Sequence, residues 1–287
     1  MLDAEVIAAH GRQYRVALAD GRTLLAFPRG KKSEVACGDR VQLALSGDGQ
    51  AVIESVAPRH SLLYRSNEFR KKLVAANVTQ IVFVVAVEPG FSDELLTRCL
   101  IAAEDQDLSV LIVLNKCDLA AGVPNALAAL APFVKLGYPL LQLSARDHAE
   151  DLRPHLEGQL SVLVGQSGMG KSTLINALVP GAEAATREIS TALDSGKHTT
   201  THATLYRFDA GSALIDSPGL QEFGLHHLDL TTIEHAFVEF RPFIGQCRFR
   251  NCRHEKEPDC AIRAAVAAGE IDPRRYEVFR TLRAQAG

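Results

Sequence analysis

The residues with the clearest chemical potential lie in a glycine-rich stretch, LVGQSGMGKSTL, at positions 163–174. The stretch has the spacing of a phosphate-binding loop, and it follows an apolar run and precedes a helical pattern. In such a loop the backbone N–H groups point at phosphates, the lysine reaches the β- and γ-phosphates, and the serine hydroxyl binds Mg²⁺. A glycine-rich turn that matches by chance is the alternative. The predicted nucleotide contacts are Gly165, Gln166, Ser167, Gly168, Met169, Gly170, Lys171, Ser172 and Thr173, with Lys171 also assigned to catalysis.

Three further short motifs each follow an apolar run. In DSPG, at 216–219, Asp216 is expected to hold Mg²⁺ through water and the Gly219 N–H to meet the γ-phosphate. In NKCD, at 115–118, the aspartate can accept hydrogen bonds from N1–H and the amino group of guanine, a donor pair that adenine lacks. This favours GTP over ATP. In the third motif, SA at 144–145, a backbone amide could donate to the guanine oxygen. The predicted contacts in these motifs are Asn115, Lys116, Cys117, Asp118, Ser144, Ala145, Asp216 and Gly219.

The polar stretch HTTTH, at 198–202, lies between the phosphate loop and DSPG. A threonine in this position can close over Mg²⁺, and the sequence alone does not choose among its three threonines. Thr200 is taken as the working choice for the magnesium ligand and for a role in catalysis. The candidates are Thr199, Thr200 and Thr201.

The residue after the glycine of DSPG bears on catalysis. In Ras-like proteins this position holds a glutamine that orients the attacking water. Here it is Leu220, which cannot hydrogen-bond to water, and Gln221 comes one residue later. We therefore expect slow hydrolysis in isolation, with activation by another residue or by a partner. His198 is the candidate to position the water, and a histidine that caps a flexible loop is the alternative.

A second constellation lies near the end of the chain, in CRFRNCRHEKEPDC at 247–260. Three thiolates and one imidazole suit tetrahedral Zn²⁺ in a closed structural site. Buried cysteines beside a surface histidine are the alternative. The other cysteines, Cys37, Cys99 and Cys117, are expected to be packing residues. The predicted zinc ligands are Cys247, Cys252, His254 and Cys260.

Length and composition limit the class of protein. The chain has 287 residues, 47% hydrophobic and 23% charged, which suits a globular protein of two or three domains. Its start lacks a basic region followed by an apolar stretch, and its longest strongly apolar run, IVFVVAV at 81–87, is too short to span a bilayer. We therefore expect a cytoplasmic protein, in which the six cysteines are reduced thiols or metal ligands.

Charge is unevenly distributed along the chain. Residues 73–240 carry 9 basic and 20 acidic side chains, whereas residues 61–72 carry 4 and 1 and residues 241–287 carry 10 and 6. An acidic middle is therefore flanked by basic regions that suit a polyanion such as RNA. Solvated surface charge is the alternative.

The elements before the motifs divide into two regions. Residues 1–58 have about five short alternating runs separated by turn signals such as Asp20-Gly21, which indicates a small closed barrel of the OB or SH3-like kind. We take the OB-like form as the prediction. Residues 59–72 form a basic connector in which Tyr64 and Phe69 either stack on exposed bases or pack on the next domain.

From residue 73 apolar strands alternate with helices, which predicts a parallel sheet covered on both faces. Strands are expected at 80–87, 108–115, 138–145 and 159–165. In switch GTPases the phosphate loop and DxxG usually precede NKxD and SA, but here the order is reversed. We therefore predict a circular permutation, which leaves a sheet intact because it changes only which strand ends are joined.

After about residue 228 the pattern is helical, with a predicted capping box at Thr231 and Glu234 and a final helix introduced by Asp272-Pro273. The segment after DxxG responds to the γ-phosphate in switch GTPases. In this chain it continues directly into the Cys/His module. GTP hydrolysis could therefore reorient that module.

The permuted order, the N-terminal barrel and the trailing Cys/His cluster resemble the RsgA (YjeQ) family of small ribosomal subunit biogenesis GTPases, over essentially the whole chain. The resemblance also supports a histidine at 198 and the short Cys-x-His step in the cluster. We predict a multi-domain α/β protein with three parts. These are an OB-like β-barrel and basic connector (1–72), a circularly permuted P-loop GTPase domain (73–223) and a helical zinc-binding domain (224–287).

The resemblance implies GTP/GDP, Mg²⁺ and one structural Zn²⁺ as bound groups. It further implies that the protein binds the small (30S) ribosomal subunit and its rRNA late in assembly, and that the subunit stimulates hydrolysis. We expect a monomer that binds neither DNA nor membranes. One alternative is a GTP-gated RNA-binding or RNA-chaperone module not dedicated to the ribosome. Another is a nucleotide-gated binding module in which hydrolysis is incidental.

Overall fold

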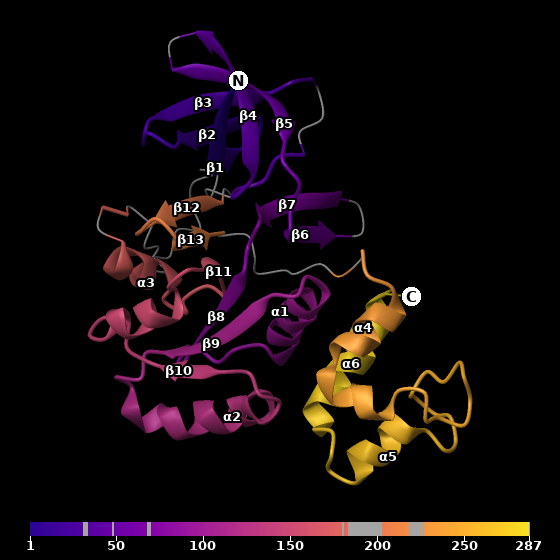
Figure 1. The fold of residues 1–287 in the computed structure, drawn as a ribbon. Coiled ribbons are helices and arrows are strands. Elements are labelled where there is room, and N and C mark those ends of the chain that lie inside the picture. The colour runs from indigo at the N-terminus through magenta and orange to yellow at the C-terminus, as the bar shows by residue number, and fades with distance from the viewer. Residues whose placement is uncertain are drawn as a thin grey trace, which may run out of the picture.

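The computed structural model describes residues 1–30, 34–47, 49–67, 70–179, 181–182, 203–217, 225 and 227–286. Figure 1 shows a small barrel at the N-terminus, a central sheet with helices on its faces, and a helical module beside the helices that cover one of those faces. Among the described residues, the helices lack the combined length and apolar character that a membrane crossing requires.

The barrel consists of β1 (Leu2–His10), β2 (Gln13–Leu18), β3 (Thr23–Pro28), β4 (Arg40–Gly47) and β5 (Gln50–Val56). Its strand order is β1-β2-β3-β5-β4, and pairing of β1 with β4 closes it. Strands β3 and β5 run parallel, while the other pairs are antiparallel. Alternate residues such as Val6, Val16 and Leu43 fill the interior. The predicted OB-like barrel is confirmed.

The predicted connector is largely a β-hairpin. β6 (Leu62–Asn67) pairs with β7 (Arg70–Ala76) in a separate two-stranded sheet. The aromatic ring of Tyr64 lies 5.0 Å, centroid to centroid, from that of His227, so this side chain packs against the C-terminal part of the chain. Phe69, the other predicted aromatic, lies outside the described residues.

The central sheet contains β8 (Gln80–Ala86), β9 (Ser109–Asn115), β10 (Leu140–Gln142), β11 (Leu160–Val164), β12 (Thr204–Arg207) and β13 (Ala213–Asp216). Their order is β10-β9-β8-β11-β13-β12. All neighbours are parallel except β12, which is antiparallel to β13. The predicted parallel sheet is confirmed, although β10 is shorter than the expected 138–145. β12 also pairs with β1, which joins barrel and sheet into one 11-stranded sheet.

Helices cover both faces of this sheet, because its strands present apolar side chains on both sides. α1 (Asp93–Asp105) and α2 (Val123–Lys135) pack with Phe83 and Val85 on one face. α3 (Lys171–Leu178) and the 3₁₀ segment η2 (Ala149–His155) pack with Val82 and Val84 on the other. A further 3₁₀ turn, η1 (Ala120–Gly122), precedes α2.

The C-terminal module contains α4 (Leu230–Ala236), the 3₁₀ segment η3 (Val238–Phe243), α5 (Ala261–Ala267) and α6 (Pro273–Ala286). Its core is built around Phe237, Phe240 and Phe279, whose ring centroids lie 4.9–5.3 Å apart. The expected capping box was wrong. The N-cap of α4 lies two residues earlier than predicted, because the helix begins at Leu230 and the Asp229 side chain caps it by accepting from the Thr232 N–H at 2.7 Å.

Candidate nucleotide and metal sites

The sequence motifs meet at one edge of the sheet, since the carboxyl ends of parallel strands lie on the same side. The phosphate loop follows β11, NKCD begins at the last residue of β9, and Asp216 is the last residue of β13. Ser144 and Ala145 follow β10. Strand β11 lies between β8 and β13, so the phosphate loop occupies the middle of this edge.

The glycines of the phosphate loop are required by close backbone approach. Gly165 has φ +148°, and a Cβ there would lie 2.2 Å from the Val84 carbonyl oxygen. Gly170, the N-cap of α3, has φ +91°, and a Cβ there would lie 2.2 Å from Nδ2 of Asn115. L-residues rarely adopt such φ values, so both positions need glycine. Between them Ser167 and Gly168 are exposed, whereas Met169 is buried in the core.

The Asn115 side chain ties three loops together. It is 1% exposed, and its Nδ2 donates to the Met169 carbonyl at 2.8 Å. Its Oδ1 accepts from the backbone N–H groups of Ala145 and Lys116, both at 2.8 Å. A buried amide held by three hydrogen bonds in this way fixes its surroundings. Asn115 therefore sets the spacing between the phosphate loop and the NKCD and SA loops.

Lys171 and Asp216 form the charged centre of this edge. The Lys171 ammonium donates to the carbonyls of Gly165 at 2.6 Å and Gln166 at 2.8 Å. Burial lowers the pKa of Lys171, and nearby Asp216 opposes that shift. Burial likewise raises the pKa of Asp216, which the Lys171 charge opposes. Each charge thus stabilises the other in a site shielded from water. Ser172 and Thr173, in the first turn of α3, are half-buried beside them.

The other end of the edge carries the predicted base-recognition residues. Asp118 is exposed, so its carboxylate is open to solvent and to a ligand. Lys116 has φ +62°, and its ammonium donates to the Glu88 carbonyl at 2.7 Å. The Cys117 N–H donates to Leu143 at 3.1 Å. Ser144 is 5% exposed, and its hydroxyl donates to Asp147 at 2.9 Å.

Several predicted residues belong to segments that the structure does not describe. They include the residue predicted to position water, the three candidate magnesium ligands, the glycine of DSPG and the two residues that follow it. Their roles therefore stay predictions. These residues are His198, Thr199, Thr200, Thr201, Gly219, Leu220 and Gln221.

The loop between β8 and α1, residues 87–92, is not among the site residues predicted from the sequence, yet it contacts the phosphate loop. Its Ser92 N–H donates to the Gln166 side-chain oxygen in the phosphate loop at 3.0 Å. Pro89 lies 3.7 Å from the position that a Cβ on Gly168 would occupy. A signal was available, because this loop follows the strand beside β11 and must emerge at the same edge.

The four predicted metal ligands converge in the C-terminal module. Their ligand atoms all lie within 4.8 Å of one another. Nδ1 of His254 is 3.3 Å from the Cys260 sulfur and 3.5 Å from the Cys247 sulfur, and those two sulfurs are 3.9 Å apart. Ligands about 2.0–2.3 Å from a tetrahedral zinc would be separated by roughly 3.5–3.8 Å. The donor set and its spacing therefore fit zinc.

A carboxylate supports the histidine of this cluster. Oε2 of Glu234, on α4, lies 3.3 Å from Nε2 of His254. Histidines that bind a metal through one ring nitrogen commonly donate the other N–H to a carboxylate, which fixes the tautomer and the ring orientation. The sequence predicts Glu234 as part of a capping box. Its position in the structure is that of a partner to the cluster.

The strand order explains why the phosphate loop comes late in the chain. Strands β8, β9 and β10 precede the loop in sequence, yet they lie beside β11 on the side opposite β13. A permutation can leave such a sheet intact because only the connections between strand ends change. The fold and the site thus define a circularly permuted P-loop GTPase.

Comparisons with known proteins agree with this class. A model of the RsgA GTPase family matches residues 56–226. The small ribosomal subunit biogenesis GTPase RsgA of Nitrosospira multiformis is 54% identical over 281 residues, covering 98% of this chain and 90% of that protein. The RsgA of Burkholderia pseudomallei strain K96243 is 55% identical over 282 residues, covering 96% and 90%. The chain belongs to the RsgA GTPase family and is a GTP hydrolase.

Solved structures show the same architecture. The crystal structure of YjeQ from Thermotoga maritima matches with a TM-score of 0.75 and 30% identity, covering 99% of this chain and 98% of that chain. The crystal structure of YloQ, described as a circularly permuted GTPase, matches with a TM-score of 0.70 and 23% identity, covering 100% and 95%. The predicted permuted fold is confirmed.

Proposed function

We propose that this chain acts in the late maturation of the small ribosomal subunit, hydrolysing GTP to GDP and phosphate while bound to it. The process is taken from the names of the relatives, which are small ribosomal subunit biogenesis GTPases. The observation that carries the chemistry is the edge where Asn115 holds the phosphate loop beside the NKCD and SA loops. We expect the protein to act in the cytoplasm, together with the ribosomal subunits, and as a monomer.

Each side chain at this edge has a defined role in the proposal. The phosphate loop and Lys171 bind the β- and γ-phosphates, and the exposed Asp118 accepts hydrogen bonds from guanine. Ser172 and a threonine, taken as Thr200, would bind Mg²⁺, and Asp216 would hold it through water; the ion would neutralise charge on the phosphates. His198 positions the attacking water, a task that Leu220 cannot perform.

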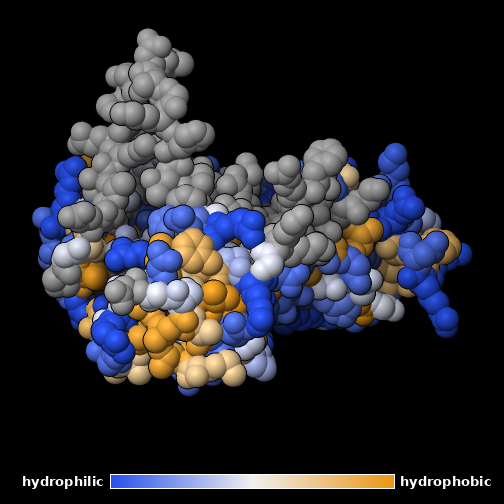
Figure 2. All heavy atoms as spheres, turned by 90° about the horizontal axis from the view of Figure 1, so that it is seen from above, coloured by the Kyte–Doolittle hydropathy of each residue, from blue (hydrophilic) through white to orange (hydrophobic). Residues whose placement is uncertain are grey.

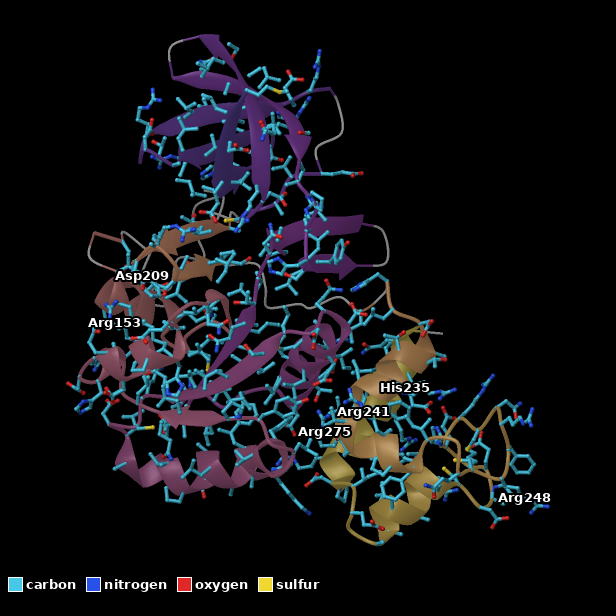
Figure 3. All side chains as sticks on the ribbon, in the orientation of Figure 1. Arg153, Asp209, His235, Arg241, Arg248 and Arg275 are labelled. Atoms are coloured by element: carbon cyan, nitrogen blue, oxygen red, sulfur yellow. The ribbon has the colours of Figure 1, made fainter. Side chains whose placement is uncertain are left out.

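The basic end of the C-terminal module supports contact with rRNA. Figure 2 shows strongly hydrophilic residues at the outer end of this module, on the right, and Figure 3 shows Arg248 extending away from the body there. The Arg248 guanidinium lies 5.5 Å from the ring centroid of Phe249, which is 41% exposed. Exposed cations beside an exposed aromatic suit backbone phosphates and unstacked bases. The exposed basic residues here are Arg248, Arg250, Arg253 and Lys256.

One structural Zn²⁺, bound by Cys247, Cys252, His254 and Cys260, would hold this basic loop in shape. The ligand spacing and the Glu234 partner support zinc. We assign it a structural role, since all four tetrahedral positions are filled by protein side chains.

The test is GTP hydrolysis by the purified chain, alone and with small ribosomal subunits, with ATP and large subunits as controls. We expect slow turnover alone, strong stimulation by small subunits, and loss of turnover in Lys171→Ala. Asp118→Asn supplies a matched test of base recognition, because an amide can donate to the C2 carbonyl of xanthine, whereas the carboxylate suits the guanine amino group. We expect the Asp118→Asn variant to prefer XTP over GTP as its substrate.

A GTP-gated RNA-binding or RNA-chaperone module is the second candidate, favoured by the same basic loop. Turnover that rises equally with unrelated structured RNA and with small subunits would support it and contradict a dedicated ribosomal role.

A further inference from the structure

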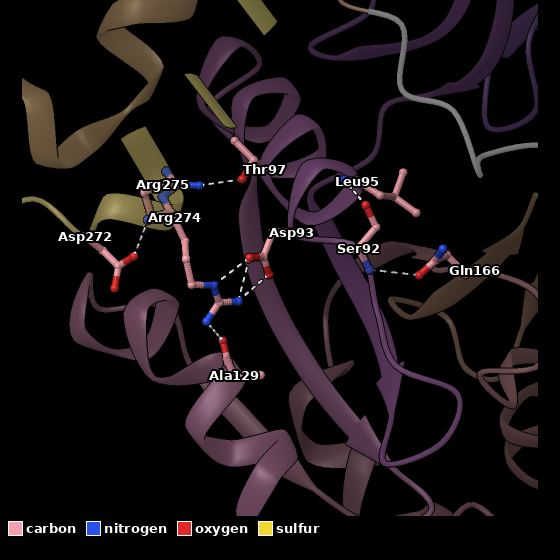
Figure 4. A network of polar contacts seen from close by, with 9 residues as sticks. All are labelled: Ser92, Asp93, Leu95, Thr97, Ala129, Gln166, Asp272, Arg274 and Arg275. Atoms are coloured by element: carbon pink, nitrogen blue, oxygen red, sulfur yellow. Dashed lines mark hydrogen bonds and ion pairs between the residues drawn. The ribbon is translucent and has the colours of Figure 1, made fainter. Parts of the chain in front are cut away.

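The N-terminal end of α1 lies between the phosphate loop and the C-terminal module, as Figure 4 shows. Ser92 makes hydrogen bonds there through its backbone and its side chain. Its backbone N–H donates to the Gln166 side chain at 3.0 Å, and its hydroxyl caps α1 by accepting from the Leu95 N–H at 3.2 Å. The start of α1 is thus fixed to the phosphate loop by a directional hydrogen bond.

The next residue, Asp93, is held from the other side by Arg274 of α6 (Figure 4). The guanidinium donates from Nε to Oδ2 at 2.8 Å and from Nη2 to Oδ1 at 2.7 Å, a bidentate geometry. Its Nη1 also donates to the Ala129 carbonyl of α2 at 3.2 Å. Arg274 therefore joins the C-terminal module to two helices of the GTPase domain at one point.

These contacts form a short path to the phosphate-binding lysine. The backbone carbonyl of Gln166 accepts from Lys171 at 2.8 Å, while its side chain accepts from Ser92. We propose that Arg274 is a positioning residue for nucleotide binding: by holding Asp93, it keeps the start of α1 against Gln166 and so keeps Lys171 in place. This inference rests on the proposed binding of GTP at the phosphate loop.

The molecule supplies a matched control at the opposite end of α1. There Arg241 of η3 pairs with Glu104 at 2.6 Å. The two ion pairs join the same module to the same helix with similar exposure, 46% and 26% for Arg274 and Asp93 against 50% and 27% for Arg241 and Glu104. Glu104 lies about 16 Å along the helix from Asp93. If these ion pairs only hold the module in place, losing either one should have a similar effect on nucleotide binding. If Arg274 positions the phosphate loop, only the loss of the Arg274 pair should weaken nucleotide binding.

The experiment measures the Kd of the full-length chain for fluorescent ribose-labelled GDP and for a non-hydrolysable GTP analogue. We expect Arg274→Gln to raise both Kd values by about two- to fivefold, the scale of an exposed but well-oriented ion pair. Arg274→Lys keeps the charge and should recover part of the loss, while Arg241→Gln should leave Kd unchanged. Thermal unfolding without nucleotide should be lowered slightly by both Arg241→Gln and Arg274→Gln, the latter losing the Ala129 contact as well.

A double variant tests the path itself. Gln166→Leu removes the acceptor for the Ser92 N–H, so adding Arg274→Gln to it should weaken binding no further. Additive losses in the double variant, or equal Kd values for Arg274→Gln and the wild type, would overturn the inference. A wild-type chain that binds neither nucleotide would instead contradict the proposed function.

Discussion

The barrel and the C-terminal module are attached to the GTPase domain by different kinds of contact. The barrel is joined through backbone: Ala8 pairs with Thr204, the Ala9 N–H donates to Ala203 at 3.3 Å, and the Ala76 N–H donates to Cys37 at 2.8 Å. The C-terminal module is joined to α1 through side chains. Ile101 of α1 packs in the core of the module, and polar contacts to α1 come from Arg241, Arg274 and Arg275. Figure 3 shows Arg241 and Arg275 at that junction.

This difference has a physical consequence. The contact between the barrel and the central sheet, here called the barrel seam, consists of backbone hydrogen bonds over a shared core that includes the fully buried Cys37. These hydrogen bonds fix the register of the barrel seam. Exposed ion pairs can change partners through rotamer changes at little cost. At the module junction the buried Arg275 and the bidentate Arg274 resist such change, whereas Arg241 at the rim permits it. We therefore expect the barrel seam to be rigid and the Arg241 side of the module junction to be adjustable.

Removing the proposed zinc should give the largest effect, because metal binding free energy is also folding free energy for such modules. We expect Cys260→Ser, or chelation, to abolish protection from hydrogen exchange in α4–α6 while the barrel stays protected. Cys117→Ser, outside the cluster, should retain the metal. Unchanged protection in the module after metal loss would show that its aromatic core folds unaided.

Breaking the buried centre of the module junction should come next. Arg275 pairs with Glu239 at 2.7 Å with 3% and 5% exposure, and it donates to Thr97 at 2.7 Å. Arg275→Met leaves Glu239 buried without its partner and should lower the free energy of unfolding by about 3–5 kcal/mol in urea titrations. Removing both charges, in Arg275→Met with Glu239→Leu, should recover much of it. If Arg275→Met lowers the free energy of unfolding by less than about 1 kcal/mol, Arg275 is not the buried centre of the module junction.

The barrel seam can be strained at one glycine. Gly38 has φ +89°, and a Cβ there would lie 2.3 Å from the Ala76 carbonyl oxygen. Gly38→Ala should therefore cost about 2–3 kcal/mol of unfolding free energy, from the left-handed backbone and the contact together. Gly21→Ala, with φ +84° and open space around it, isolates the backbone share at about 1 kcal/mol. Equal losses in the two variants would mean that the seam adjusts.

The smallest effect is expected at an ion pair across the barrel seam. Arg207 pairs with Glu5 at 2.5 Å, with 42% and 23% exposure. If the backbone carries this attachment, Arg207→Ala should lower the free energy of unfolding by about 0.2–1 kcal/mol. A loss of several kcal/mol would remove the contrast between the two junctions.

Local pattern was sufficient wherever chemistry depends on residues close in sequence. The phosphate loop, NKCD and DSPG each follow a strand as predicted, and the metal ligands lie within 14 consecutive positions, 247–260. The capping box failed because Asp229, two residues before Thr231, is the better N-cap residue and is the one that caps the helix. Glu234, the other residue of the predicted capping box, contacts His254 instead. The domain boundaries stay a prediction.

The sequence by itself determined the motifs, their permuted order and the alternation of strands and helices, because these depend on spacing along the chain. Only the tertiary structure decided that Asn115 ties the loops, that Gln166 meets Ser92, and that Arg274 meets Asp93. The last pair is separated by 181 positions. Such contacts depend on strand order and helix packing, which bring distant residues together without leaving a mark on either local sequence.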